Sequence, residues 1–401
     1  MTFGIYETLM LACLVLFLGR LFVGNIKFLR MYNIPEPVVG GFLVALVSWV
    51  VYLVSGTEVE FHEKFQESMM FVFFSAIGLN ADFAQLLKGG KSLIVFLLIC
   101  AAFIIFQDLV GIGMAKIMNL DLRFGLIAGS VSLTGGHGTA GAWADDFLAS
   151  GQPLIGAKEI GMACATFGLI FGGIIGGPLA QRLLKKNNYK ELSEEEQRNQ
   201  EDTHEIIDEE FTDERVTYRS LFQTVTMLAV CLVTGMYVGE WSAQFTFKLP
   251  TFVWCLFIGV IIRNLLTHGF KQKIDNEPID IIGNIGLSLF LATALMSLKL
   301  WLVINLALPI LVILLVQVVS MLLYAGYVTY RAMGKDYDAI VLSAGHCGFG
   351  LGATATAVAN IQAVTNRFGH SFKSFLIIPM VGAFFIDIIN ALVLNIFVTL
   401  I

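Results

Sequence analysis

The sequence predicts an all-α polytopic membrane protein with about ten transmembrane helices, in two inverted-topology five-helix repeats, each with a re-entrant Gly-rich loop. Of the 401 residues, 57% are hydrophobic and 14% are charged, and the mean hydropathy is +0.78. Soluble domains are closer to half apolar and one quarter charged. The apolar residues form long runs, and a glycine-rich stretch with a histidine interrupts them once in each half.

Ten runs are apolar and long enough to cross a bilayer, which takes about 20 residues of helix. They cover 5–23, 37–54, 68–87, 92–115, 159–183, 220–239, 250–267, 282–299, 302–330 and 374–400. The first Gly-His loop, 132–143, precedes span five, and the second Gly-His loop, 343–360, precedes span ten. Each is too polar to face lipid and too apolar for a solvent loop, so we expect two re-entrant segments surrounded by protein or water.

The two halves match in the order of their features. Residues 34–44, which open span two, resemble 247–260, which open span seven, and 70–80 resemble 287–299. An odd number of spans in each half gives the two halves opposite orientations, as in many secondary transporters. We therefore expect an N-terminal transmembrane repeat over 1–184, a cytoplasmic acidic linker over 185–219 and a C-terminal transmembrane repeat over 220–401.

The distribution of lysine and arginine predicts the orientation in the membrane. With both termini outside, the inner segments hold about twice as many of these residues as the outer segments, even without the central linker. This places the linker in the cytoplasm, with the first Gly-His loop entering from outside and the second from inside. The linker itself reads as a solvated connection rather than a regulatory domain.

The residue types in the two Gly-His loops favour contact with a small charged ligand. Glycine lets backbone N–H and C=O groups approach a ligand, a helix N-terminus attracts anions, and unwound carbonyls or Thr and Asn oxygens hold Na⁺. The alternative is close helix packing through small residues, which we prefer only for the glycines of span five. The candidates are Gly135, Gly136, Gly138, Thr139, Gly345, Gly348, Gly350, Gly352, Thr354, Thr356 and Asn360.

Six further residues are candidates for function. His137 and His346 fit ligand contact and structural support equally well, whereas a metal site other than one for Na⁺ would need a partnered cluster of Cys, His or Asp. Arg367 follows the second loop closely and suits a carboxylate, although a positive-inside anchor is the alternative. Asp387 and Asn390 share one helical face in span ten and indicate a cation site; Asp108 is a similar but weaker case.

Several classes of function are excluded or disfavoured by what the sequence lacks. It has no phosphate-binding loop, kinase motif or redox motif, and its six cysteines form no CxxC pair. Ser343 and His346 have no acidic residue to orient them, so hydrolysis is disfavoured and we expect no enzyme. The charge balance gives no reason to expect nucleic acid as a partner. A channel is disfavoured, because inverted repeats favour alternating access.

The chain resembles the bacterial sodium/glutamate symporters (the ESS family) from end to end, apart from the linker. The matching stretches are 32–41, 76–81, 135–139, 161–169, 344–354 and 379–388. Ala355 is a small departure, because the family pattern has proline between the two threonines. The resemblance implies Na⁺-coupled glutamate uptake across the bacterial inner membrane by a homodimer with an elevator-like mechanism. It implies Na⁺ as the coupling ion and no cofactor.

The resemblance also suggests how the candidate residues divide between glutamate and Na⁺. Arg367 would hold the side-chain carboxylate, as an Asn-Arg pair does in the architecturally similar citrate/sodium symporters, and loop N–H groups would hold the α-carboxylate. A loop carbonyl, Thr354 or Thr356 would take the ammonium group. Na⁺ would lie with Asp387, Asn390 or Asn360. The alternative is a symporter of the same build for another small organic anion, such as a dicarboxylate.

Overall fold

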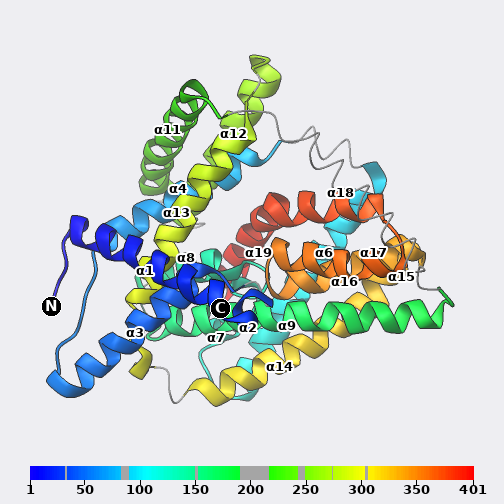
Figure 1. Ribbon diagram of the computed structural model, residues 1–401, viewed down its shortest axis with the longest axis horizontal. Coiled ribbons are helices and arrows are strands. Elements are labelled where there is room, and N and C mark those ends of the chain that lie inside the picture. The colour runs from blue at the N-terminus through cyan, green and yellow to red at the C-terminus, as the bar shows by residue number, and fades with distance from the viewer. Residues whose placement is uncertain are drawn as a thin grey trace.

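The protein is all-helical in the part of the chain that the computed structural model describes (Figure 1). The described residues are 1–31, 34–82, 90–149, 152–189, 216–242, 249–272, 274–302 and 306–401. Most of the expected linker, the end of expected span three and the start of span nine lie outside these residues.

The helices follow the expected spans closely. The long ones are α1 (Ile5–Asn25), α3 (Glu36–Ser55), α4 (Glu63–Asn80), α6 (Gly90–Ile117), α9 (Ala157–Lys186), α11 (Tyr218–Ser242), α12 (Thr251–Asn264), α13 (Asn276–Met296) and α14 (Ala307–Tyr324). The others are α2 (Lys27–Met31), α7 (Leu122–Leu126), α8 (Gly136–Ala149), α15 (Tyr330–Ala332), α16 (Tyr337–Leu351), α17 (Thr354–Phe368), α18 (Phe372–Met380) and α19 (Ile386–Leu400). Wider π-helical turns are η1 (Ile127–Val131), η2 (Leu265–Gly269), η5 (Ala325–Thr329) and η6 (Val381–Phe385), and η3 (Leu300–Leu302) is a short 3₁₀ turn.

Among the described residues, eight helices are long and apolar enough to cross a membrane. They are α1, α3, α6, α9, α11, α12 with η2, α13, and α14 with η5 and α15. Expected span three corresponds to α4, whose first turns are polar, beginning at Glu63. Expected span ten is divided by η6 into α18 and α19. Neither segment is among these eight helices, and α19 is one of the shorter apolar helices.

Local sequence explains where several helices begin and end. Pro35 and Pro250 directly precede α3 and α12, where a missing N–H costs nothing. Gly56 ends α3 with φ of 67°, a conformation that glycine adopts without strain. Asp336 caps α16 by accepting a hydrogen bond from the Ala339 N–H at 2.8 Å.

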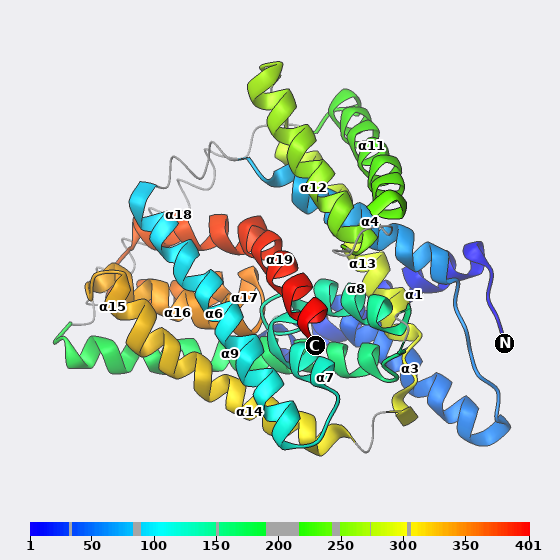
Figure 2. The same ribbon diagram turned by 180° about the vertical axis from the view of Figure 1, so that it is seen from behind.

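The helices form two bundles that each combine both halves of the chain (Figures 1 and 2). In the first bundle, α4 packs on α12 and α13, α3 packs on α1 and α13, and α11 packs on α12. In the second bundle, α9 packs on α8, α14, α16 and α17, and α6 packs on α7, α14 and α19. We call them the outer bundle and the core bundle. The expected repeats therefore do not fold as separate units in space, because each bundle takes helices from both.

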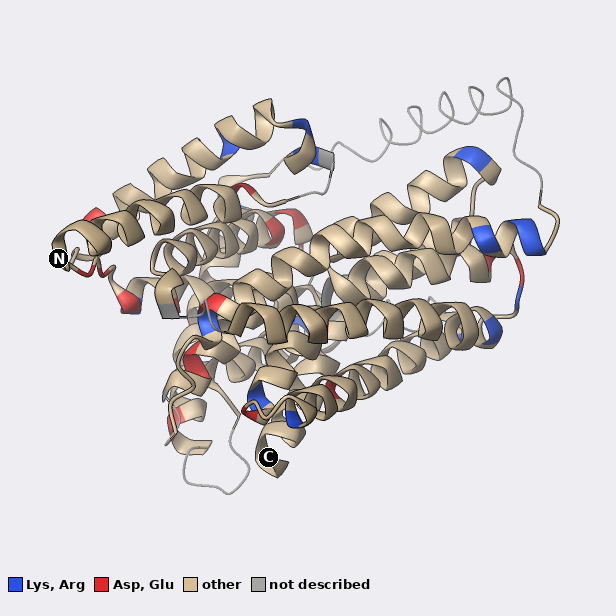
Figure 3. Ribbon diagram, turned by 90° about the horizontal axis from the view of Figure 1, so that it is seen from below, with Lys and Arg blue, Asp and Glu red and all other residues tan. Residues whose placement is uncertain are grey.

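Lys and Arg predominate at one end of the molecule, whereas Asp and Glu gather, together with some Lys and Arg, toward the other end (Figure 3). At one end, the last turn of α9 carries Lys185 and Lys186, and the adjoining Asn187 accepts a hydrogen bond from Tyr330 at 3.2 Å. At the other end, Lys299 donates from its amine to Glu58 at 2.6 Å and from its backbone to Glu159 at 2.7 Å. The hydrogen bond to Glu58 raises the pKa of the Lys299 amine. We call these the basic end and the acidic end.

Candidate functional site

The first Gly-His loop forms the tip of a helical hairpin. The first arm is α7 with η1, and its backbone leaves helical geometry at Gly129 (φ −104°, ψ −131°). The chain turns over residues 132–135, where the Gly135 N–H donates to the Ser130 carbonyl at 2.9 Å. The second arm, α8, begins at Gly136, whose φ of +66° requires the freedom of glycine. The turn therefore lies directly before His137.

The second Gly-His loop forms another hairpin, in which α16 and α17 pack side by side. Helical geometry stops at Gly352 (φ −140°, ψ −93°) and Ala353 (φ −158°, ψ 163°), and α17 starts at the next residue. The Ala353 N–H donates back to the Gly348 carbonyl at 3.2 Å. The turn lies several residues after His346, so the two histidines occupy different places in their hairpins.

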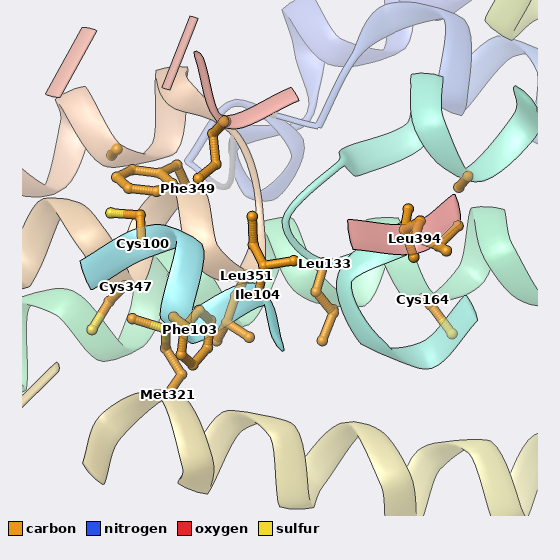
Figure 4. Packing of buried hydrophobic residues seen from close by; sticks show 14 of the residues in the cluster. Cys100, Phe103, Ile104, Leu133, Cys164, Met321, Cys347, Phe349, Leu351 and Leu394 are labelled. Atoms are coloured by element: carbon orange, nitrogen blue, oxygen red, sulfur yellow. The ribbon is translucent and has the colours of Figure 1, made fainter. Parts of the chain in front are cut away.

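The tips of the two hairpins meet beside the middle of α9. A Cβ added at Gly168 of α9 would lie 1.9 Å from the Leu351 carbonyl oxygen and 2.9 Å from Leu133 Cδ2. A Cβ added at Gly136 would lie 3.5 Å from the Gly352 carbonyl oxygen. Figure 4 shows Leu133 and Leu351 close to one another at this place. We call it the crossing.

The hairpins reach the crossing from opposite ends of α9. Toward the acidic end, Gly161 faces Ala140 of α8, and toward the basic end, Gly176 faces the Ala344 carbonyl of α16. From Gly161 to Gly168 of α9, the neighbouring residues of the first hairpin run from Ala140 down to Leu133. From Gly168 to Gly176, the neighbouring residues of α16 run from Leu351 down to Ala344. Both arms therefore run antiparallel to α9, one on each side of the crossing.

Helix ends of both kinds gather at the crossing. The N-termini of α8 and α17 lie there, as do the C-termini of η1 and α16. The first N–H groups of a helix have no acceptor within it, and Ala353 supplies no side-chain cap to α17. The positive dipole ends of two helices therefore lie beside backbone carbonyl groups. The helix N-termini can hold an anion, and the carbonyl oxygens can hold a cation at an adjacent place.

A buried polar network ties the tips to α6 and α14. Thr134 of the first tip donates to Gln107 Oε1 at 2.7 Å and also lies 3.2 Å from the Gly350 carbonyl oxygen of the second hairpin. Gln107 Nε2 donates to that same carbonyl at 3.0 Å, and Gln317 Nε2 donates to the Gln107 carbonyl at 2.8 Å. These residues hold the two hairpins in contact through hydrogen bonds shielded from water.

His137 lies at the start of α8, next to the crossing, and is 6% exposed. Its Nε2 is 2.9 Å from Thr166 Oγ1, and that hydroxyl donates to the Met162 carbonyl at 2.9 Å. The Thr166 hydroxyl therefore accepts from His137, which leaves Nδ1 as the histidine's second polar atom. This arrangement combines structural support with a polar atom beside the crossing.

His346 is fully buried in the middle of α16, away from the turn. Four aromatic rings surround it, with centroids 5.2–6.0 Å from its own: Phe96, Phe103, Tyr324 and Phe349. Its Nδ1 is 2.9 Å from Thr329 Oγ1, and its Nε2 has no hydrogen-bond partner among the described residues. The surroundings favour structural support over ligand contact, the two interpretations that the sequence left open.

The predicted glycines of α16 face neighbouring protein atoms. An added Cβ would lie 2.6 Å from Ile378 Cδ1 at Gly345, 2.4 Å from Ala357 Cα at Gly348 and 3.0 Å from Met321 Sδ at Gly350. Close helix packing through small residues, rather than ligand contact, therefore describes these three positions best. Gly352 lies at the turn itself, where its carbonyl oxygen faces Gly136 of the first tip.

The hydroxyl residues and the other loop glycines lie closer to the crossing. Thr354 Oγ1 donates to the Gly382 carbonyl of η6 at 2.5 Å, and Thr356 Oγ1 is buried without a hydrogen-bond partner among the described residues. In the first hairpin, the Thr139 side chain lies against Gly135. Gly138 lies against Phe73 of α4, so it lets α8 pack on the outer bundle.

Arg367 lies in the last turn of α17, at the basic end, and is exposed. It lies thirteen positions after Thr354, a distance of roughly 20 Å along a helix. Asn360 is buried between these positions and donates to the Gly172 and Ala344 carbonyls at 2.9 and 3.1 Å. The structure therefore brings neither side chain to the crossing, because α17 is a continuous helix that carries them away from the turn.

The predicted cation residues of α19 lie beside the first hairpin. Asn390 is 1% exposed and its Nδ2 donates to the Ser130 carbonyl at 3.1 Å. Asp387 lies one turn earlier and makes no hydrogen bond or ion pair with any described residue. Ser130 and the amides of Gln107 and Gln317 were not singled out from the sequence. The two glutamines could have been identified because each is a single amide side chain inside a long apolar run.

A cavity of about 1080 Å³ opens between the two bundles at the acidic end. It is lined by α4, the later part of α8, the start of α9 and the start of α12, down to Ala142 and Phe252. Glu67, Asp145 and Asp146 are among its acidic side chains. The cavity therefore approaches the crossing along α8.

Comparison with known proteins places this chain in a family. Residues 1–370 match the family model described as sodium/glutamate symporter. The chain is 53% identical to a sodium/glutamate symporter of Haemophilus influenzae over 395 residues, covering 98% of this chain and 97% of that protein. It is 47% identical to a sodium/glutamate symporter of Escherichia coli K12 over 393 residues, with the same coverage. The chain belongs to the sodium/glutamate symporter family, a family of membrane transporters.

Proposed function

We propose that this protein is a secondary active transporter that takes up glutamate together with Na⁺ by alternating access. The observation that carries the proposal is the crossing, where the N-termini of α8 and α17 face one place from opposite hairpins. A glutamate anion needs such groups, because it carries two carboxylates to be desolvated. The names of the two relatives supply the substrate and the ion.

In this proposal, backbone N–H groups at the starts of α8 and α17 hold the glutamate carboxylates. Residues 135–139 supply one side of the site, and Gly352, Thr354 and Thr356 supply the other. The buried Thr356 hydroxyl, which has no partner among the described residues, is a ready contact for the ammonium group. His137 supports the first side through Thr166. Arg367 meets glutamate only at the basic end, on entry or release, while the hairpins hold the described conformation.

We propose that Na⁺ lies close to the glutamate site, where η1 and α19 meet. Asn390 and Asp387 supply side-chain oxygens there, and the unwound turn around Gly129 supplies backbone carbonyls. Asn360 ties α17 to α9 and α16, so its contribution to cation binding is to hold the second hairpin in place. A cation beside the substrate offsets the negative charge of glutamate.

The proposal includes ten membrane segments in two inverted repeats with paired re-entrant hairpins. Three features support it. The order of helices is the same in the two halves, the hairpins approach α9 from opposite ends, and both turns meet at one place. Placing the turns in register aligns Gly136 with Gly352, and hence Gly129 with Gly345. Aligning the two histidines would instead place the first turn opposite the middle of α16.

We propose that the basic end faces the cytoplasm and that both termini face the periplasm of a bacterial inner membrane. The gathering of Lys and Arg at one end supports this orientation. Met1 donates to the Glu58 carbonyl, so the N-terminus lies at the acidic end. Ser371, just before α18, donates to Asp338 near the basic end, and the chain then passes the crossing toward its C-terminus. The acidic cavity would then be the periplasmic approach to the site.

The division into two bundles supports an elevator-like movement, with the core bundle carrying the crossing past the outer bundle. The links between them include the hydrogen bonds of Gln66 to Asp145 and of Lys158 to Gln66, both 2.9 Å. Partly exposed polar links of this kind can exchange partners at modest cost. A homodimer held through the outer bundle completes the proposal.

The direct test is glutamate uptake into proteoliposomes that contain the purified protein. An inward Na⁺ gradient should drive accumulation of labelled glutamate, and replacing external Na⁺ with choline should abolish it. An excess of unlabelled dicarboxylate should compete poorly. Uptake that does not depend on Na⁺, or that a dicarboxylate blocks better than glutamate does, would contradict the proposed coupling or the proposed substrate.

A further inference from the structure

Asp108 of α6 holds its carboxylate in a buried position beside the first hairpin. Its side chain is fully buried and accepts from the Ser130 N–H at 2.9 Å and from the Ser130 hydroxyl at 3.0 Å. No described lysine, arginine or histidine forms an ion pair with it. An ionised carboxylate shielded from water costs several kcal/mol unless a positive charge accompanies it.

Close helix packing brings this carboxylate to the first hairpin. A Cβ at Gly111 of α6 would lie 2.1 Å from the Gly125 carbonyl oxygen, so the backbones of α6 and α7 touch there. The two helices run antiparallel, and one turn farther on, Ser130 reaches Asp108. The backbone of Gly129 approaches so closely that an added Cβ would lie 3.0 Å from Asp108 Oδ1.

Two further oxygen atoms near the same turn have no hydrogen-bond partner among the described residues. Asn390 donates from Nδ2 to the Ser130 carbonyl, and its Oδ1 is buried with no hydrogen-bond partner among the described residues. Ser132 Oγ is also fully buried and has no partner among them. The Ser130 hydroxyl uses its proton on Asp108, which leaves its lone pairs free to bind a cation.

We infer that Asp108, Ser130 and Asn390 bind a sodium ion, with Ser132 close by, and that Asp108 is a charged ligand of this site in addition to Asp387. Carboxylate, hydroxyl and amide oxygens suit a hard cation. The inference rests on the proposed function and extends it. It adds α6 to the cation site, so that one ion would join α6, the first hairpin and α19. The ion would then fix the first tip, and with it the N-terminus of α8, for glutamate.

The test is Na⁺ binding to the purified protein in detergent without glutamate. Sodium chloride is titrated against choline chloride at constant ionic strength, and the thermal unfolding midpoint is followed. Asp108→Asn should raise the apparent Kd for Na⁺ about tenfold or more, since it removes the charged ligand. The variant should fold, because it replaces a buried charge with a neutral group of the same shape.

Ser130→Ala keeps the backbone hydrogen bond to Asp108 and removes one ligand, so it should weaken Na⁺ binding about threefold or more. Ser75→Ala is the matched control: Ser75 is equally buried but lies in α4 of the outer bundle, and its Na⁺ response should match the wild type. An unchanged Na⁺ response in Asp108→Asn overturns the inference. So does a variant in which the pH dependence of uptake changes while Na⁺ binding does not, because Asp108 would then be a proton carrier. If wild-type uptake and stability both ignore Na⁺, the proposed function fails first.

Discussion

The two Gly-His motifs look alike in the sequence but hold their histidines in different surroundings. His137 follows the turn of its hairpin directly and lies beside the crossing, bonded to Thr166. His346 precedes the turn of its hairpin and is enclosed by aromatic rings, bonded to Thr329. A histidine next to a turn can contact a ligand, whereas one in the middle of a packed arm holds helices together.

The difference shows that position relative to the turn decides the role of a residue. Both motifs are rich in glycine, but their glycines differ in role. The glycines of α16 before the turn allow neighbouring backbone and side chains to pack closely, whereas Gly136 and Gly352 lie in the turns themselves. The two hairpins are therefore alike in their turns and differ in where their histidines lie. Each of the following changes tests one part of that comparison.

The largest effect should come from the place where the hairpins meet. Gly168→Ala puts a Cβ 1.9 Å from the Leu351 carbonyl, which is backbone and cannot move aside without displacing the second tip. We expect Na⁺-driven glutamate uptake to fall about a hundredfold, equivalent to roughly 3 kcal/mol. Gly177→Ala is the control in the same helix, because its Cβ would meet open space. Equal uptake by the two variants would show that the tips do not need this contact.

His346→Ala should lower stability more than substrate affinity. It opens a cavity among four aromatic rings and leaves the buried Thr329 hydroxyl without its partner, a loss of about 2–4 kcal/mol. The thermal unfolding midpoint in detergent should fall by several degrees, and His346→Phe, which refills the cavity, should recover part of it. The Kd for glutamate of the folded variant should stay within about threefold. A selective loss of affinity at unchanged stability would make His346 a ligand contact.

His137→Ala should show the reverse pattern. It removes a polar group beside the crossing and a hydrogen bond to Thr166, so the Kd for glutamate should rise about tenfold. Its unfolding midpoint should fall less than that of His346→Ala. Glutamate binding at saturating Na⁺, measured on the purified protein, gives the comparison, and identical behaviour of the two variants would remove the distinction between the hairpins.

The smallest effect is expected at Arg367. Its position at the exposed end of α17 keeps it about 20 Å of helix from the crossing. Arg367→Ala should therefore change the equilibrium Kd for glutamate less than threefold, although it can slow uptake if the arginine guides glutamate at the basic end. An increase of tenfold or more in Kd would return Arg367 to the substrate site, as its sequence neighbourhood suggests.

The sequence was sufficient to predict the long helices, because length and hydropathy mark them directly. It also marked the two hairpins, because glycine interrupts apolar runs there. It did not predict that the helices of the two halves would mix in two bundles, since that depends on long-range packing such as α4 against α12. It could not separate Arg367 from the tip either, because α17 continues as a helix through residues that look like loop. Thr134 and Ser130 were overlooked, since single hydroxyl residues are common in packed helices.

If glutamate binds where the two tips meet, it should protect a thiol placed at the start of α17 from labelling. In a background without the six native cysteines, Ala355→Cys places a thiol at the exposed start of α17, and Ala363→Cys places one on an exposed later turn of the same helix. Glutamate with Na⁺ should slow labelling of Ala355→Cys about tenfold and leave Ala363→Cys unchanged. Protection at Ala363→Cys alone, or at neither position, would contradict a glutamate site at the crossing.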